Sequence, residues 1–261
     1  MFIRPGVYPQ VVCRGILGIV LFYLGYPDQA LAHNNAAVAE ALRVTHPPSL
    51  SMSLTNICRL LWLVGDITAL KERADKVIAV ATEQGFPFWG ALGTFYREWS
   101  KMKTGDAVGG AALLRITVAN YRATGAELGV PFMLALIAEA YDIAGQNGEG
   151  LTLLDEALQI VETTGERWFA AELNRRKGQL LLRQGYSEVA EDLYRNALSI
   201  AQGQEAKLWE LRAAVSLARL RSDQGRRTEA LNLLAPVYAW FTEGFDTPDL
   251  KEAKALLDEL G

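Results

Sequence analysis

The sequence has few of the residues that build metal sites or nucleophilic sites. Its 261 residues include two cysteines and two histidines. Neither His33 nor His46 has a cysteine or a carboxylate at the spacing of a metal-binding motif, so we expect no metal site. Cys13 and Cys58 both lie in apolar stretches, where a free cysteine usually behaves as a small buried hydrophobe. This use of cysteine favours a reducing, cytoplasmic environment.

An excess of positive charge is also absent. The chain has 26 basic and 30 acidic side chains, which gives a formal net charge of −4. Non-specific binding of nucleic acids depends on a strong electrostatic attraction to the phosphates, and this chain does not supply one. We therefore expect no nucleic-acid partner.

The motifs of nucleotide binding and acid–base catalysis are missing as well. A phosphate-binding loop ends in Gly-Lys-Ser or Gly-Lys-Thr, and neither tripeptide occurs. The glycine-rich residues 145–150 follow an expected helix rather than a strand, so we interpret them as a turn. The carboxylate pairs Asp155-Glu156 and Glu191-Asp192 lie on helix faces that we expect to be exposed, where they serve solubility. We therefore expect no enzymatic activity and no cofactor.

No apolar run is long enough to cross a membrane. The most apolar segment, residues 11–24, has about 14 residues and contains Arg14, whereas a spanning helix needs roughly 20 apolar residues. A secretory signal is the less favoured alternative, because Gly15 and Gly18 interrupt the run and a polar amphipathic helix follows it. We interpret the segment as the first helix of a repeat and expect no membrane partner.

Glycine, in contrast, is abundant and strictly spaced. One series recurs every 40 residues with no insertion or deletion: Gly25, Gly65, Gly105, Gly145, Gly185 and Gly225. A second series follows 20 residues behind part of the first: Gly85, Gly125 and Gly165. Because glycine adopts the left-handed conformation that closes helices and costs about 1 kcal/mol inside one, each 40-residue unit is predicted to contain two helices.

Small residues recur at fixed distances from the turn glycines, as the close packing of paired helices requires. Five residues after each turn stand Ala30, Leu70, Gly110, Gly150, Ala190 and Ala230, and seven residues before it stand Gly18, Cys58, Glu98, Ala138, Gly178 and Ala218. Leu70 and Glu98 are the two exceptions to the rule of small residues. This arrangement resembles the tetratricopeptide repeat (TPR), with 40 residues in place of 34. It predicts an all-α, right-handed TPR-like solenoid that forms a single domain, residues 1–261.

The predicted solenoid has six helical hairpins and a final capping helix. The hairpins are expected at about 10–45, 49–85, 87–125, 130–165, 167–204 and 206–242, and the cap at 247–260. In the cap, an apolar stripe of Leu250, Ala253, Leu257 and Leu260 would cover the last hairpin, and charged residues would face water.

Several segments also resemble the C-terminal repeats of large bacterial regulatory proteins. The similarity is close from residue 164 onward and looser before it. It is carried by residues 24–31, 164–168, 177–181, 210–214, 216–220, 223–227 and 240–247. In that family, TPR-like repeats follow an AAA-type ATPase module, commonly behind a class III adenylate or guanylate cyclase domain or a DNA-binding domain. The resemblance implies a regulatory and interaction module that is the C-terminal part of a multidomain bacterial signalling protein or is related to one. None of the residues that the family uses for ATP binding or cyclisation occurs here.

Positions of the first helix of each hairpin line the concave face of a TPR array and form the one candidate binding site. Counting back from the turn glycines, we hypothesise that a protein or peptide binds in a groove lined by Arg59, Trp62, Phe95, Trp99, Met102, Glu139, Arg175, Gln179 and Arg219. The alternative is that Trp62, Phe95 and Trp99 pack between first helices, because the longer repeat changes the rotational register of the helices.

The first helix should also leave one apolar face open. Residues 16–23 are apolar except for Gly18, nearly all round the helix. We expect a homodimer contact or an upstream domain to cover this face. Together these patterns predict a non-catalytic scaffold or signal-input module. The alternative is a domain that senses a small effector for a cyclase or a transcription regulator.

Overall fold

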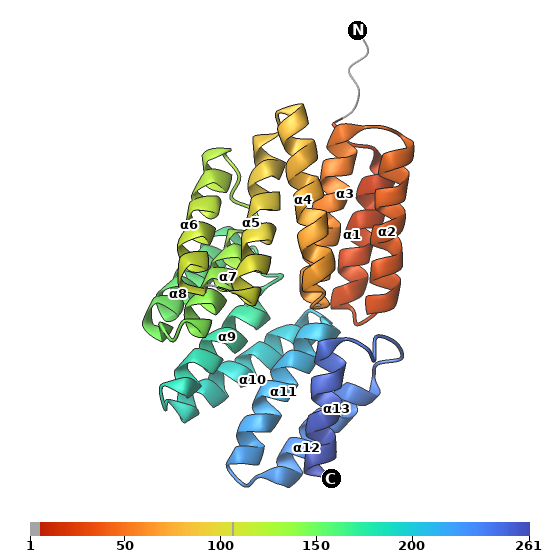
Figure 1. Ribbon diagram of the computed structural model, residues 1–261. Helices are drawn as coiled ribbons and strands as arrows, with labels where there is room; N and C mark the ends of the chain where they lie inside the picture. The colour runs from red at the N-terminus through yellow and green to blue at the C-terminus, as the bar shows by residue number, and fades with distance from the viewer. Residues whose placement is uncertain (1–5, 106) are drawn as a thin grey trace. The chain divides into compact units, whose positions relative to one another are not determined.

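The computed structural model describes residues 6–105 and 107–261 of the chain (Figure 1). Contacts divide these residues into two compact units. Unit 1 is built from α1 (Pro9–Tyr23) up to Phe22, and from α2 (Pro27–Arg43), α3 (Pro47–Leu63), α4 (Ile67–Gln84), α5 (Pro87–Thr104) and α6 (Ala107–Ala123). Unit 2 is built from α7 (Val130–Ile143), α8 (Asn147–Thr164), α9 (Ala170–Arg183), α10 (Ser187–Gly203), α11 (Lys207–Asp223), α12 (Arg227–Ala239) and α13 (Pro248–Leu260).

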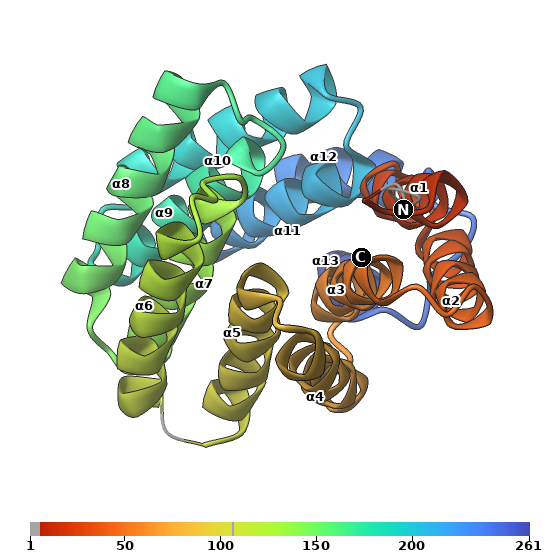
Figure 2. The ribbon, with the colours of Figure 1, turned by 90° about the horizontal axis from the view of Figure 1, so that it is seen from above.

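The all-α prediction is confirmed. Thirteen helices account for all regular secondary structure in the described residues, and they fit six pairs followed by one last helix. Within each unit, helices that follow one another in the chain pack side by side (Figure 2). That the chain forms a single domain stays a prediction. None of the helices in the described part of the chain is both long and apolar enough to cross a membrane.

Glycine and proline set the helix ends. Eight of the nine glycines in the two series have φ between 68° and 92°, the left-handed region that glycine adopts without strain. Gly105 does not follow the expectation. Its φ of −162° is extended backbone, although α5 still ends just before it. Proline occupies the first turn of α2, α3, α5 and α13, where its missing N–H breaks no helical hydrogen bond.

The expected small residues lie where helices pack closely. Ala30, Ala190 and Ala230 have no exposed surface, and neither has Leu70 at the equivalent position. A Cβ atom on Gly178 would lie 2.8 Å from Cε1 of Tyr194, so α9 and α10 approach each other more closely there than a larger residue allows. The spacing pattern therefore marks true packing positions.

Three side chains differ from their expected places. Cys58 is buried as expected, but Cys13 is exposed. Glu191 was expected to face water, yet it is 9% exposed, because Arg226 reaches back from the start of α12 and contacts it at 3.1 Å. In α13, Leu250, Ala253 and Leu260 are buried as expected, but Leu256 takes the place of Leu257 in the stripe, and Leu257 is only half-buried.

Candidate functional site

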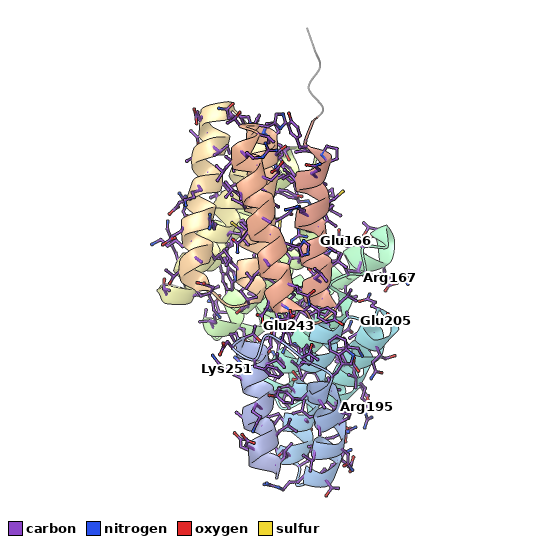
Figure 3. All side chains as sticks on the ribbon, turned by 90° about the vertical axis from the view of Figure 1, so that its right-hand side faces the viewer. Glu166, Arg167, Arg195, Glu205, Glu243 and Lys251 are labelled. Carbon is purple, nitrogen blue, oxygen red and sulfur yellow. The ribbon has the colours of Figure 1, made fainter. Side chains whose placement is uncertain are left out.

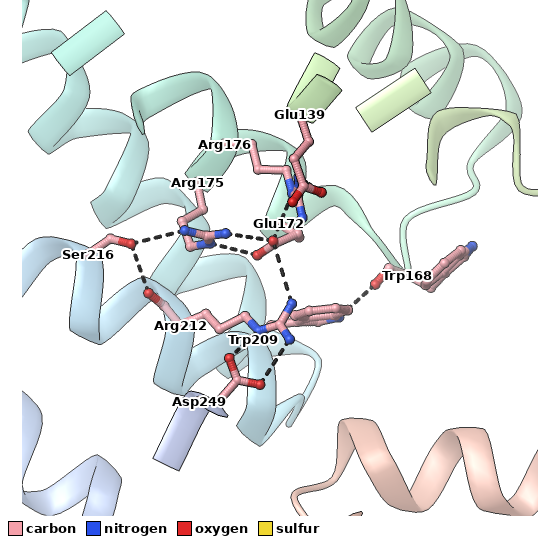
Figure 4. A network of polar contacts seen from close by, with 9 residues as sticks. All are labelled: Glu139, Trp168, Glu172, Arg175, Arg176, Trp209, Arg212, Ser216 and Asp249. Atoms are coloured by element: carbon pink, nitrogen blue, oxygen red, sulfur yellow. Dashed lines mark hydrogen bonds and ion pairs between the residues drawn. The ribbon is translucent and has the colours of Figure 1, made fainter. Parts of the chain in front are cut away.

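The first helices of the hairpins in unit 2 are neighbours. Helix α9 packs against both α7 and α11, and α11 packs against α13. A network of polar side chains connects these four helices (Figure 4). It includes Glu139 and Arg175, two of the residues of the predicted binding site.

Glu172 is at the centre of the network. Its side chain is fully buried on α9, and Arg175 donates two hydrogen bonds to it, each 2.7 Å long. Arg176 donates from Nε to Oε1 at 2.9 Å, and Nη1 of Arg212 lies 3.7 Å from the same oxygen. Burial opposes the charged form of Glu172. The nearby guanidinium groups, Arg175 first among them, outweigh burial and hold the pKa of this carboxyl well below its usual range.

Arg212 extends the network to the last helix. It donates from Nε and Nη2 to the two carboxylate oxygens of Asp249, at 2.8 and 2.9 Å. Its guanidinium carbon lies 5.1 Å from the centroid of the Trp209 ring, and Nε1 of Trp209 donates to the backbone carbonyl of Trp168 at 3.1 Å. Burial opposes the charge of Arg212, but Asp249 and Glu172 raise its pKa above the ordinary value. The arginine is therefore fixed in place by α9, α11 and α13 together.

Three further hydrogen bonds complete the network. Nη1 of Arg176 donates to Oε2 of Glu139 on α7 at 3.1 Å. Nη1 of Arg175 donates to the hydroxyl of Ser216 at 3.3 Å, and this hydroxyl donates to the backbone carbonyl of Arg212 at 3.0 Å. Three arginines thus meet three carboxylates, and the charges balance. The arrangement presents guanidinium groups in fixed orientations, which suits the recognition of carboxylate or carbonyl oxygens.

The predicted site residues of unit 2 lie on one face. Glu139 and Arg175 belong to the network, and Gln179 is half-buried one turn further along α9. Arg219 on α11 is exposed and forms an ion pair with Glu252 of α13 at 3.4 Å. We call these four residues the first-helix face of unit 2. Charged residues on other surfaces of this unit, such as Arg167, Arg195 and Lys251, are also exposed (Figure 3).

The predicted site residues of unit 1 are mostly buried. Phe95 has no exposed surface, and Trp99, Met102 and Trp62 are 3%, 2% and 6% exposed. The rings of Trp62 and Trp99 meet edge to face with centroids 6.2 Å apart. These contacts correspond to the alternative in which the aromatic residues pack between first helices.

Arg59 is the remaining predicted residue of unit 1. Its side chain is half-buried and interacts with the hydroxyl of Tyr96. Burial raises the pKa of Tyr96 to about 12, although Arg59 acts in the opposite direction. That a partner binds the set of five residues in unit 1 stays a prediction.

The count from the turn glycines also places Glu172 and Arg212 on the concave face, although neither is among the nine residues of the predicted site. The other members of the network lie outside the counted positions, namely Trp168, Arg176, Trp209, Ser216 and Asp249. A spacing signal marks some of them. The pairs Arg176–Glu139 and Arg212–Asp249 are each separated by 37 residues, and Arg175–Ser216 and Trp209–Trp168 by 41. With a period of 40, these separations are one repeat minus three residues or plus one. Searching for opposite charges at these separations would have found both ion pairs.

Comparison with known families and proteins gives one relative and many similar structures. No family model matches the chain. An uncharacterized protein of Rhizobium meliloti (strain 1021) is 25% identical over 224 residues, which is 85% of this chain. The matched region is 22% of that protein's length. The chain therefore spans about a fifth of the curated relative that it matches.

The similar structures include a TPR protein and two proteins in complex with a factor or a peptide. A thermophilic TPR protein of Thermus thermophilus aligns with a TM-score of 0.55 at 16% identity, over 79% of this chain and 98% of that one. A Rap protein complexed with Competence and Sporulation Factor aligns with a TM-score of 0.67 at 12% identity, over 96% and 73%. NprR in complex with its cognate peptide NprX also gives 0.67, at 14% identity over 96% and 71%. The fold is that of a TPR-like helical repeat protein.

Proposed function

We propose that the chain is a non-catalytic interaction module of a regulatory protein, and that it binds a peptide or protein segment on the first-helix face of unit 2. The observation that carries this proposal is the way Glu172 holds Arg175 and Arg176. Their side chains are 17% and 14% exposed, so part of each reaches solvent while its orientation is fixed. A partner that offers carboxylate or carbonyl oxygens loses little side-chain entropy on binding such groups.

Two similarities support this proposal. The Rap and NprR structures, which share the fold over 96% of this chain, are complexes with Competence and Sporulation Factor and with the cognate peptide NprX. The relative from Rhizobium meliloti is more than four times as long as the region that it shares with this chain. Both agree with a binding module within a multidomain signalling protein, such as the cytoplasmic regulators with ATPase and cyclase domains that the sequence resembles.

A peptide selection followed by matched charge reversals tests the proposal. Peptides selected from a displayed random library on the wild-type chain are labelled, and their affinities are measured by fluorescence anisotropy. Arg219→Glu should weaken binding about tenfold or more, because it places like charges at the contact. Arg195→Glu on α10 makes the same change on another exposed surface and should leave affinity within about twofold. Equal losses in the two variants, or no selectable peptide, would contradict the proposal.

A cavity in unit 1 favours a second candidate, the binding of a small effector. It has a volume of about 280 Å³ and lies between the α2–α3 connection and the end of α4. Its lining includes Leu42, His46, Leu50, Val80 and Glu83. A mixed apolar and polar lining of this size is close to the lower limit for small-molecule sites.

Thermal unfolding in the presence of small-molecule pools distinguishes the two candidates. A ligand at 100 times its Kd stabilises a protein by about 2.7 kcal/mol, whereas a peptide module shows no shift until a peptide is added. Val80→Trp would fill the cavity and should abolish a shift that arises there. A shift that survives Val80→Trp would place the effector elsewhere.

A further inference from the structure

The exposed surface of α1 is apolar and continuous. Ile16, Leu17 and Val20 are 50%, 43% and 44% exposed, and Cys13 is exposed one turn before them. Spacings of three, four and seven residues place all four side chains on one face of the helix. The opposite face is occupied, because α1 packs Val11 against α2 and approaches Asn56 of α3 at Gly15 (Figure 2).

The repeat shows what the equivalent face does elsewhere. The equivalents of Val20 in later repeats follow it at multiples of 40 residues. They include Leu60, Ser100, Leu180 and Leu220, and each is at most 4% exposed. The equivalents of Cys13 include Ser53, Gly93, Leu173 and Ala213, and all are buried. Of the helices that carry these positions, α1 is the one in which both are exposed.

The cover of that face is the second helix of the preceding hairpin. In α11, Leu217 and Leu220 pack against Ala190 and Tyr194 of α10. A Cβ atom on Gly93 of α5 would lie 2.9 Å from Val77 of α4. In α9, Lys177 forms an ion pair with Asp155 of α8 at 2.6 Å. The positions that α1 exposes are therefore the contact positions of a repeat-to-repeat interface.

We propose that the apolar face of α1 is such an interface, and that its occupant is the second helix of a further TPR-like hairpin, N-terminal to α1 in a longer polypeptide. The equivalents of Leu17 and Val20 in α11 are both leucines, so α1 offers nearly the same surface that α11 offers to α10. A second copy of the chain fits less well end to end, because the exposed side of α13 carries Lys251, Glu252, Lys254 and Asp258. The charged face of α13 does not complement an apolar one.

This inference shares with the proposed function only the statement that the chain belongs to a longer protein. It concerns α1 and involves none of the arginines of unit 2. Its failure and the failure of peptide binding are therefore separate experimental results.

The reactivity of Cys13 reports directly whether the apolar face of α1 is covered. Under native conditions a maleimide should modify Cys13 quickly and spare Cys58, which is buried. For the test, a copy of residues 167–206 is placed directly before residue 7, which keeps the 40-residue register and adds no cysteine. Modification of Cys13 should then slow at least about tenfold, because the added hairpin must first detach. Peptide mapping by mass spectrometry assigns the label to Cys13.

Two controls make every result decisive. In the extended chain, Leu17→Glu with Val20→Glu should restore fast modification, since both side chains are exposed in the parent and their replacement leaves its fold intact. In the parent chain, the rate should not depend on protein concentration. Unchanged modification in the extended chain overturns the proposal. If protection of Cys13 in the parent chain depends on concentration and sedimentation shows a dimer, a second copy covers the face, and the proposal is overturned. Slow modification of the parent chain at all concentrations overturns it as well.

Discussion

Arg176 on α9 donates a hydrogen bond to Glu139 on α7, 37 residues earlier and 3.1 Å away. Arg212 on α11 is the equivalent of Glu172, one repeat later, and it pairs with Asp249 of α13 across the same separation. Each pair connects two neighbouring helices through one guanidinium group. Glu172 lies between them and contacts both arginines, so its carboxylate joins the two connections.

Removing the charge of Glu172 should destabilise unit 2 strongly. In Glu172→Gln, the guanidinium groups around a buried position lose their counter-charge, and breaking a buried pair in this way costs about 3–5 kcal/mol. Urea denaturation followed by circular dichroism measures the loss in the free energy of unfolding. Glu252→Gln removes an exposed partner of Arg219 and should change stability by less than about 0.5 kcal/mol. Similar losses in both variants would show that burial of Glu172 is unimportant.

The contribution of Glu172 should also depend on pH. Because its pKa is lower in the folded chain than the value of about 4.3 in an unfolded one, its stabilising effect is fully present above that value. The effect is lost as the pH falls toward the folded pKa. The difference in unfolding free energy between wild type and Glu172→Gln should therefore be constant from pH 7 to about pH 5 and shrink below it. A difference that grows on acidification would contradict the assignment.

Gly178 should not tolerate a methyl group. A Cβ atom there would lie 2.8 Å from Tyr194 and 3.2 Å from the backbone carbonyl of Ala190, so Gly178→Ala should cost about 1–3 kcal/mol through overpacking. Gly148→Ala is the matched control, because it is also helical and nothing lies within 4 Å of its Cβ position. It should stabilise the chain by about 0.4–1 kcal/mol. In thermal melts, the Tm should fall in Gly178→Ala and rise in Gly148→Ala. Changes in the same direction would show that α9 and α10 are less closely packed.

Replacing Trp99 should lower the stability of the chain rather than remove a direct contact with the partner. It is 3% exposed and packs edge to face on Trp62, so Trp99→Ala should lower the free energy of unfolding by about 3–5 kcal/mol. Arg59→Ala removes a half-buried member of the predicted groove and should cost less. Chemical denaturation and the affinity of a selected peptide are measured for both. If affinity falls in Trp99→Ala while stability does not, the aromatic residues of unit 1 contact the partner.

The fold could be predicted from the sequence because its requirements are local. The turns require a left-handed φ, as at Gly65 and Gly185, and the helix pairs require a small residue, as at Ala190 and Ala230. Both requirements are independent of the rest of the chain. Gly105 was the exception, since a turn can also be made in extended backbone, and the sequence does not distinguish the two cases.

The site was predicted less completely because it depends on long side chains and on helix rotation. Counting from the turn glycines identified Glu139 and Arg175, but it does not say which carboxylate each arginine contacts. The burial of Trp62 and Trp99 depends on the rotation of α3 and α5 about their axes, which glycine spacing does not determine. The exposed face of α1 was predictable, because residues 16–23 are apolar nearly all round the helix and one neighbouring face cannot cover them all.

The separations of 37 and 41 residues also limit how such a chain can change in length. Each contact pairs one repeat with the next, so gaining or losing a 40-residue repeat leaves every other pair at its usual separation. One residue inserted in the middle of α9 would rotate the rest of that helix by about 100° and separate Arg176 from Glu139. Proteins of this architecture should therefore lengthen by duplicating whole repeats, and differences of a few residues should be confined to the connections between helices.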